Sequence, residues 1–473
     1  MLWKIRLMNS PFVTSRHTTI KLLSILLFVV LFLSGLVTDG MFFDGIAYAD
    51  VARNLAIGDG SFWDLHYTQT FNYHYHDQPP LTFLIQAIFF KCLGTSIYVE
   101  RFYCFAFALF WIVVIAKLFS LYTADRSAGY LPIILWMTVS IVPWTFQNNL
   151  EEVTMGFFAL CGVYFALNGM LRQRLLLVFI AGIFTFCASF CKGAQGLFPI
   201  VAPFLFYITY RTISFRKLME YQVVIMAFPI FMYVLFFFYE PANTSYTLYA
   251  KTRLVRTFLN QSNTTSFRFQ ILIDLLVELI IPILLSIGLF FWSRKQQWKV
   301  SSYATFMVLM ALSASLPLTV TMEQRPFYLT PSIPFYVLAL AAICYNSYYD
   351  LYSRWDIETN RIRNVNIVLV VLLFIGTVVV FINPNNPKRD KALLHDIYLL
   401  KKAIPEGSTI SITDNLFFEY HLHAYMNRYG RYSLETASKQ TFFLARKKEE
   451  VALDSLYSEC INGYQYFDVY ERK

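Results

Sequence analysis

Acidic and imidazole side chains gather in one stretch of the sequence, Asp39 to Leu81. Those that could take part in chemistry are Asp39, Asp44, Asp50, Asp59, Asp64, His66, His74, His76 and Asp77. Carboxylates and imidazoles can accept a proton from a substrate, and imidazoles also bind metal ions. A chain that only crossed a membrane would not concentrate these groups, so we expect the stretch to handle a polar ligand.

Asp44 is the first candidate for a catalytic role. A carboxylate placed beside an attacking hydroxyl can accept its proton, so Asp44 is a candidate general base. A structural role is the alternative, because Asp is favoured at helix N-termini and the following residues, GIAYADVARNLA, have a helical pattern.

Other candidates lie beside long apolar segments. Lys192 precedes a glycine in CKGAQG, Glu151 and Glu152 end NNLEE, and Arg325 and Tyr328 belong to EQRPFYLTP. Each has a simpler explanation: a Lys snorkels from a helix end, a Glu caps a helix N-terminus, and a Tyr belongs to the aromatic belt. If the helix ends converge, these residues form the walls of one cavity.

The composition indicates a polytopic membrane protein. The 473 residues are 57% hydrophobic and 15% charged, with 47 Phe and 32 Tyr. The net charge of +9 comes largely from short basic clusters between apolar runs, which is typical of membrane topology signals and argues against nucleic acid as a partner. The seven cysteines form no CxxC pair, and Cys460 stands alone near the C-terminus, so they indicate neither a zinc site nor a disulfide framework.

Eleven segments are long and apolar enough to cross a membrane as helices. They are 20–38, 101–122, 128–144, 152–170, 175–191, 196–210, 221–239, 271–292, 300–321, 327–346 and 364–382. Leu81–Leu93 is shorter, and we expect it to lie along the interface, because the basic clusters then fall on the side of the basic N-terminus. This topology predicts a cytoplasmic N-terminus, with the loop 39–100 and everything after Phe381 on the outer face.

The C-terminal part of the chain is more polar. NPNNPKRD is typical of a linker, 390–403 and 415–427 have helical patterns, and 408–412, 441–446 and 464–470 have strand patterns. We therefore expect a transmembrane domain at 1–382, with a catalytic first outward loop at 39–100, and a small soluble α/β domain at 383–473.

The order of motifs resembles a known family. Asp44, Tyr48 and Trp63 precede DQPPL, and KGAQGLFP and RPFYLTPSIP follow later in the chain. This order resembles the bacterial ArnT/PMT-like GT-C glycosyltransferases, which take a sugar from a polyprenyl-phosphate carrier. Two positions depart from the family pattern: Gly45 stands where many members have Glu, and Gln78 where many have Lys.

The resemblance implies a fold and a set of site residues. The fold would be an all-α polytopic membrane protein with about 11–13 transmembrane helices and outward-facing interfacial helices, together with the small C-terminal α/β domain. Asp44 would be the base, and Glu151 would contact the sugar or assist Asp44. The residues expected to bind the donor phosphate or sugar are Arg53, His74, His76, Asp77, Gln78, Lys192, Arg325 and Tyr328.

The histidines of the first loop leave a second possibility open. Alternating residues of an extended segment point to the same side, so His74 and His76, with Asp77, could hold a divalent metal ion. Neutral hydrogen bonding to sugar or phosphate and simple exposure are the alternatives. The transfer chemistry itself demands no metal or other cofactor, because a phosphate leaves without acid help.

The resemblance therefore implies an integral-membrane glycosyltransferase of a bacterial inner membrane. It would move a sugar from a polyprenyl-phosphate donor to a lipid (lipid A-like), glycan or protein acceptor on the outer face, with inversion at the sugar. The alternative is a transporter or flippase of polyprenyl-linked lipids without chemistry. Its helices would be expected in two related halves, and the sequence has no internal repeat.

Overall fold

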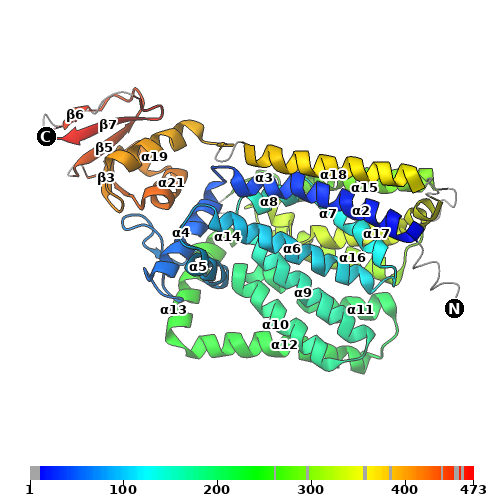
Figure 1. Ribbon diagram of the computed structural model, residues 1–473. Coiled ribbons are helices and arrows are strands. Elements are labelled where there is room, and N and C mark those ends of the chain that lie inside the picture. Colours follow the sequence, from blue (N-terminus) through cyan, green and yellow to red (C-terminus); the bar gives the residue numbers. More distant parts are fainter. Residues whose placement is uncertain are drawn as a thin grey trace. The chain divides into compact units, whose positions relative to one another are not determined.

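The structure is a computed structural model that describes residues 11–259, 263–293, 298–354, 359–382, 386–437, 440–451, 457–459 and 463–473 (Figure 1). Cys460 and the first three residues of the predicted linker, 383–385, lie outside this described part. By packing, the chain forms two compact units. We call Met1–Gly35, Phe105–Phe146 and Glu151–Ile382 the helical unit, and Leu36–Cys104, Gln147–Leu150 and Asn383–Lys473 the mixed unit.

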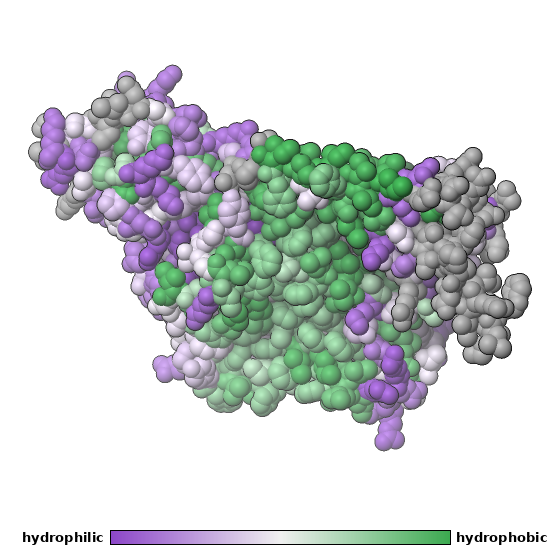
Figure 2. All heavy atoms as spheres, viewed as in Figure 1, coloured by the Kyte–Doolittle hydropathy of each residue, from purple (hydrophilic) through white to green (hydrophobic). Residues whose placement is uncertain are grey.

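Long apolar helices make this a multi-pass membrane protein. Among the described residues, eight segments are long and apolar enough to span a membrane: His17–Val37, Val99–Ser120, Glu152–Leu171, Leu175–Tyr210, Phe215–Phe238, Gln270–Trp292, Ser302–Val320 and Asn364–Ile382. Figure 2 shows apolar side chains over the helical unit and polar ones over the C-terminal strands. The predicted class, a helical membrane protein with a C-terminal α/β segment, is confirmed.

Three differences separate these eight segments from the eleven spans expected from the sequence. The predicted spans 175–191 and 196–210 fall within one apolar segment, Leu175–Tyr210, in which α10 (Leu175–Lys192) ends at Gly193 and is followed by η3 (Gly193–Val201) and α11 (Ala202–Tyr210). The predicted span 128–144 bends by 77° between α7 (Tyr130–Met137) and α8 (Ile141–Gln147). The predicted span 327–346 corresponds to α17 (Ile333–Arg354), whose second half is rich in Tyr, Asn and Ser.

Helix pairs build the helical unit (Figure 1). α9 (Glu152–Leu171) packs on α10, α10 on α12 (Phe215–Phe238), α16 (Ser302–Ser315) on α17, and α18 (Thr359–Ile382) on α2 (Pro11–Phe28). The remaining elements that lie in this unit, wholly or in part, are η1 (Val29–Leu33), α3 (Ser34–Val37), α6 (Val99–Ser120), η2 (Arg126–Gly129), α13 (Glu240–Tyr249), η4 (Ala250–Leu254), α14 (Val255–Phe258), α15 (Gln270–Trp292), η5 (Leu316–Val320) and η6 (Pro326–Leu329).

The mixed unit contains a five-stranded sheet. Its strands follow the order β4-β3-β5-β7-β6, in which β3 pairs in parallel with β4 and β5, while β7 is antiparallel to β5 and β6. The elements of this unit are α4 (Phe43–Ile57), β1 (Leu65–His66), β2 (His74–Tyr75), α5 (Leu81–Leu93), α19 (Lys391–Ala403), β3 (Thr409–Ile412), α20 (Asp414–Phe417), α21 (Tyr420–Gly430), β4 (Ser433–Glu435), β5 (Phe442–Arg446), β6 (Tyr457–Glu459) and β7 (Phe467–Arg472).

The first loop and the C-terminal segment share one hydrophobic core. Met41 and Ile46 of the loop are buried together with Leu393, Ile397 and Tyr425 of the C-terminal helices, and α4 packs against α21. The predicted boundary after residue 382 coincides with the end of α18, at Ile382. Beyond that boundary, the C-terminal segment packs as one body with residues 36–104, which the sequence had not indicated.

Candidate functional site

Asp44 lies in the first turn of α4 and is partly exposed. The helix begins after Phe42, which is the N-cap residue and whose N–H donates to Asn148 Oδ1 at 2.6 Å. Asp44 is therefore not the N-cap residue; Phe42 holds that position without a side-chain hydrogen bond to the helix. A carboxylate in the first turn is stabilised in its ionised form by the positive end of the helix dipole, which suits a proton acceptor.

Gly45 lies where the first turn of α4 packs closely against Asn148 and Asn149. The Gly45 carbonyl accepts a hydrogen bond from Asn149 Nδ2 at 2.8 Å, and a Cβ at position 45 would lie 1.8 Å from the Asn148 carbonyl oxygen. Only glycine permits this approach. The first turn of α4 is thus fixed directly against residues 147–150.

Arg53, expected to bind phosphate, is buried inside the mixed unit. Its guanidinium lies 3.2 Å from Asp50 Oδ1 and donates from Nη1 to the carbonyls of Asn427 (2.9 Å) and Arg428 (3.3 Å). Its side chain is only 4% exposed. The structure gives Arg53 a role in joining α4 to α21, and this arrangement offers no support for a phosphate contact.

Arg428 and Glu100 form the second half of this buried network. Arg428 grips the Glu100 carboxylate with two hydrogen bonds, from Nε at 3.1 Å and Nη2 at 2.8 Å. It also donates to the carbonyls of Thr95 (3.1 Å) and Ser96 (2.8 Å). We call Asp50, Arg53, Glu100 and Arg428 the Arg428 network.

Burial shifts the pKa values within the Arg428 network. It raises the pKa of Asp50 to about 7, although Arg53 and Arg428 act in the opposite direction. Burial also lowers the pKa of Arg53, against the attraction of Asp50. For Arg428, burial disfavours the charged form, but the Glu100 carboxylate outweighs it and raises the pKa.

The histidines of the first loop gather around Asp64 on the hairpin formed by β1 and β2. His74 Nδ1 lies 2.8 Å from Asp64 Oδ1, His66 Nε2 lies 3.4 Å from Asp64 Oδ2, and His76 Nε2 lies 3.5 Å from Asp64 Oδ1. Burial lowers the pKa of His76. Burial opposes ionisation of Asp64, yet hydrogen bonds with His74 and His66 lower its pKa.

Asp77 and Gln78 occupy the turn between β2 and α5, and both are partly exposed. α5 begins after Pro80, its N-cap residue. Asp77 is not in the group of ligand-type atoms that closely surround Asp64 among the described residues, which consists of Asp64, His66 and His74. The sequence suggested His74, His76 and Asp77 as possible metal ligands. In the structure, the closely spaced ligand atoms belong instead to Asp64, His66 and His74.

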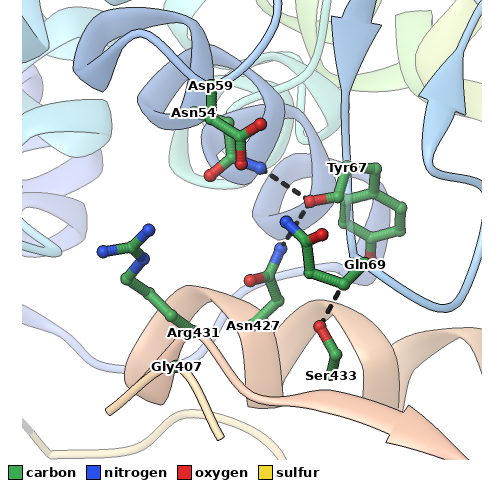
Figure 3. Close-up of a pocket in the computed structure, with 8 residues that line it drawn as sticks. All are labelled: Asn54, Asp59, Tyr67, Gln69, Gly407, Asn427, Arg431 and Ser433. Atoms are coloured by element: carbon green, nitrogen blue, oxygen red, sulfur yellow. Dashed lines mark hydrogen bonds between the residues drawn. The ribbon is translucent and has the colours of Figure 1, made fainter. Parts of the chain in front are cut away.

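A polar pocket of about 190 Å³ lies elsewhere in the mixed unit (Figure 3). Asn54 and Asn427 both donate to the Tyr67 carbonyl, at 2.6 and 3.1 Å. Arg431 and Asp59 also line the pocket. None of the residues proposed from the sequence as catalytic or donor-binding lines it.

Lys192 lies among acidic side chains in the helical unit. Its ammonium is 2.6 Å from Glu152 Oε1 and 3.9 Å from Glu151 Oε2, and both glutamates are fully buried. The Lys192 side chain is 10% exposed, so it does not snorkel into solvent. We call these three residues the Lys192 triad. The second Glu152 oxygen, Oε2, accepts no hydrogen bond from the residues that the structure describes.

Tyr328 and Arg325 come from the segment before α17. The Tyr328 ring centroid lies 4.8 Å from Lys192 Nζ, and Gln195 of KGAQG donates to the Tyr328 carbonyl at 2.8 Å. Arg325 precedes η6 as its N-cap residue and is partly exposed. Within the described part of the chain, its guanidinium forms no ion pair.

The structure thus joins Glu151, Lys192 and Tyr328, three residues that the sequence placed on separate helix ends. It also shows two partnerships that sequence reasoning missed, Glu152 with Lys192 and Asp50 with Arg53. Two residues that the sequence had not singled out, Glu100 and Arg428, complete the network around Arg53. The Asp50–Arg53 pair carried a usable signal, because residues three apart on a helix share one face. Glu100 and Arg428 carried none, since they are 328 residues apart.

Solved structures of other proteins have a fold similar to that of this chain. No protein-family model matches the chain, and no curated protein matches it in sequence. Among solved structures, ArnT from Cupriavidus metallidurans bound to undecaprenyl phosphate is similar, with a TM-score of 0.63 and 14% identity over 94% of this chain and 96% of that one. The apo state of the same ArnT gives 0.59 and 12%, over 93% of this chain and 95% of that one.

An archaeal structure extends the likeness. The oligosaccharyltransferase AglB from Archaeoglobus fulgidus, in complex with an inhibitory peptide and a dolichol-phosphate, has a TM-score of 0.51 at 11% identity, over 90% of this chain and 65% of that one. Similarity over nearly the whole length at such low identity identifies a shared fold. The chain has the ArnT-like GT-C fold.

Proposed function

We propose that the protein is a membrane glycosyltransferase that takes a sugar from a polyprenyl-phosphate carrier. The observation that carries this proposal is the ArnT-like fold over 94% of the chain, in a relative whose structure holds undecaprenyl phosphate. The motif order from Asp44 to the DQPPL turn supports it independently of the fold.

The reaction needs one base. An acceptor hydroxyl attacks the anomeric carbon, its proton passes to the Asp44 carboxylate, and the carbon–oxygen bond to phosphate breaks with both electrons leaving on the phosphate. Attack opposite to the leaving group inverts the anomeric configuration. Asp44 suits this role because it is partly exposed and lies in the first turn of α4, where the helix dipole favours its ionised form.

The charges in the helical unit indicate which residues bind the phosphate and which bind the sugar of the polyprenyl-phosphate sugar. The Lys192 triad has two carboxylates for one ammonium, so it is rich in acceptors and suits the hydroxyl groups of a sugar better than a phosphate. Arg325 forms no ion pair with a described residue and has the planar fork that grips phosphate. We therefore assign phosphate binding first to Arg325 and sugar binding to Glu151, with Tyr328 as a stacking surface.

The cellular setting follows from the same proposal. Basic clusters on the side of the N-terminus support a cytoplasmic N-terminus and an outer-face active site in a bacterial inner membrane. The acceptor would be a lipid, a glycan or a protein presented on that face.

The test is sugar transfer by purified protein in liposomes, supplied with a panel of radiolabelled polyprenyl-phosphate sugars. Asp44→Asn should lower turnover about 100-fold or more, the contribution expected of a general base, while donor binding persists. Asp414→Asn is the matched control, because Asp414 also lies in the first turn of a helix, α20, and is exposed; it should keep full turnover.

Two outcomes would contradict the proposal. Equal turnover of the Asp44→Asn and wild-type proteins would remove Asp44 from the chemistry. Absence of transfer to every acceptor, combined with movement of the carrier lipid between leaflets, would establish a transporter without chemistry.

A further inference from the structure

The β1–β2 hairpin places two imidazoles directly opposite each other. His66 and His74 are register partners in the antiparallel pair, and side chains of such partners project from the same face. Asp64, just before β1, reaches the same place. One ligand-type atom from each of these three residues can be chosen so that all lie within 4.8 Å of one another.

These distances fit a tetrahedral metal site. Bonds of about 2.0–2.1 Å from zinc to nitrogen or oxygen place neighbouring ligand atoms roughly 3.3 Å apart. The separation of 3.4 Å between His66 Nε2 and Asp64 Oδ2 already matches that value. His74 Nδ1, hydrogen-bonded to Asp64 Oδ1 at 2.8 Å, would need to lose its proton and move away by about half an ångström.

His76, which lies beside Asp64 but outside the group of three closely spaced ligand atoms, is the candidate for a fourth ligand. His76 follows His74 by two residues, and its Nε2 lies 3.5 Å from Asp64 Oδ1. Its side chain is 11% exposed, whereas those of His74 and Asp64 are 60% and 43% exposed. His76 therefore lies on the buried side of the site, and His74 and Asp64 lie on the side that is open to an ion from solvent.

A further carboxylate orients the first histidine. Asp59 Oδ1 lies 2.8 Å from His66 Nδ1, which holds the other ring nitrogen, Nε2, toward Asp64. A carboxylate behind a histidine is the common arrangement around protein-bound metals, because it fixes the ring and its tautomer. The hairpin thus has both a ligand set and its support.

We propose that this hairpin binds one divalent transition-metal ion of the zinc class through Asp64, His66 and His74, with His76 as the fourth ligand. Three imidazoles and one carboxylate are ligands of the type that zinc prefers. This proposal does not depend on the proposed transferase function. Its structural consequence is local: the ion fixes His66, and through it Asp59, which lines the polar pocket of the mixed unit (Figure 3).

The test uses the full-length protein with a tag that contains no histidine, purified in detergent, treated with chelator and then titrated with Zn²⁺. We expect one high-affinity zinc ion per chain by calorimetry and by elemental analysis, and a tetrahedral visible spectrum with Co²⁺. Asp64→Asn and His66→Gln should each weaken binding at least tenfold. Asp59→Asn, which removes only the orienting carboxylate, should weaken it about 10- to 100-fold.

Two further variants separate metal binding from folding. His421→Gln is the matched control, because His421 also lies 3.5 Å from a carboxylate, that of Glu419, away from the hairpin; it should bind zinc as the wild type does. His74→Gln changes a ligand that is 60% exposed, so it should weaken binding without altering elution or circular dichroism. Zinc binding of equal affinity in the wild-type and His66→Gln proteins would overturn the proposal, as would a wild type that binds no zinc; the cluster would then be only a hydrogen-bonded hairpin.

Discussion

The two units each bury a cluster of charges, and the two clusters are built differently. The Arg428 network in the mixed unit has two guanidinium groups and two carboxylates, and its guanidinium groups also donate to four backbone carbonyls. The Lys192 triad in the helical unit has one ammonium for two carboxylates. The first cluster is tied to the backbone of several elements by these donated hydrogen bonds, whereas the second has more carboxylates than cations.

This difference separates a structural role from a binding role. A buried network whose guanidinium groups donate to backbone carbonyls of other elements holds those elements together. A buried cluster with excess carboxylate is stabilised when a ligand brings donors. Changes to the Arg428 network should therefore act on stability, and changes to the Lys192 triad on substrate binding.

Arg428→Leu should have the largest effect. It removes the guanidinium that grips Glu100 with two hydrogen bonds and leaves this buried carboxylate with Arg101, 3.6 Å away. Breaking a buried ion pair in this way costs about 3–5 kcal/mol. We expect a much lower melting temperature and rapid proteolysis of the C-terminal segment. Arg389→Ala is the matched control, because the Arg389–Asp390 pair is largely exposed, with the Arg389 side chain 42% exposed, and should cost about 0–1 kcal/mol. Equal melting temperatures for both variants would refute the structural role.

Lys192→Met should come next, with loss of both stability and activity. It leaves the buried Glu152 carboxylate without the ammonium that lies 2.6 Å away, at a cost of about 3 kcal/mol. The double variant Lys192→Met/Glu152→Gln removes one charge of each sign, so it should recover most of the melting temperature. It should not recover sugar transfer, measured with the active donor at saturating concentration.

The double variant decides between the two roles of the triad. If transfer returns together with stability, the Lys192 triad is a structural cluster like the Arg428 network. The contrast between the two units would then be wrong.

Asp50→Asn should change how stability depends on pH. The pKa of Asp50 is raised to about 7 in the folded protein, against about 3.9 in an unfolded chain. Between pH 4 and 7 the folded state therefore holds the extra proton, so the Asp50 contribution to stability falls as pH rises through that window and is constant above it. One pKa unit corresponds to about 1.4 kcal/mol.

The variant should thus gain melting temperature relative to wild type at pH 8, and lose that advantage at pH 5. Arg53, Arg428, Glu100 and Tyr67 are the charged and titratable groups that act electrostatically with Asp50, and all are unchanged in the comparison. Asp414→Asn should show no such pH-dependent difference, because Asp414 is exposed. A constant difference between Asp50→Asn and wild type from pH 5 to 8 would contradict the prediction.

The sequence predicted local elements far better than their partners. The helical pattern after Asp44 corresponds to α4, and the strand patterns at 408–412 and 441–446 correspond to β3 and β5. These follow from periodicity and propensity within a few residues. The Arg428 network did not follow, because it depends on packing α4 against α21, more than 370 residues later.

For the candidate site, too, the sequence predicted individual residues better than their partners. Residue types and motif order identified Asp44, Lys192 and Arg325 as candidates, since each has chemistry of its own. Whether a cation is free or already paired is set by tertiary contacts, which is why Arg53 was assigned to phosphate and is instead buried against Asp50. The partner of Lys192, Glu152, is 40 residues away and was visible only as a neighbour of Glu151.

The last prediction concerns the glycine after Lys192. Gly193 ends α10 with φ +78° and ψ −143°, and a Cβ there would lie 2.2 Å from the Tyr249 hydroxyl. Gly94 ends α5 in the mixed unit with φ +85° and ψ −172°, and its Cβ would meet nothing within 4 Å. Gly94→Ala should therefore cost only backbone strain, about 1–3 kcal/mol, and Gly193→Ala should cost more.

Tyr249→Phe tests why Gly193→Ala should destabilise the protein more than Gly94→Ala does. It removes the hydroxyl that the new Cβ would strike, so the Gly193→Ala/Tyr249→Phe protein should melt close to Gly94→Ala and above Gly193→Ala alone. Sugar transfer should recover with it if the glycine serves only to let Tyr249 approach the end of α10. Restored stability with transfer still lost would mean instead that the backbone beside Lys192 must stay bare for the substrate, which would place this turn in the binding site together with the Lys192 triad.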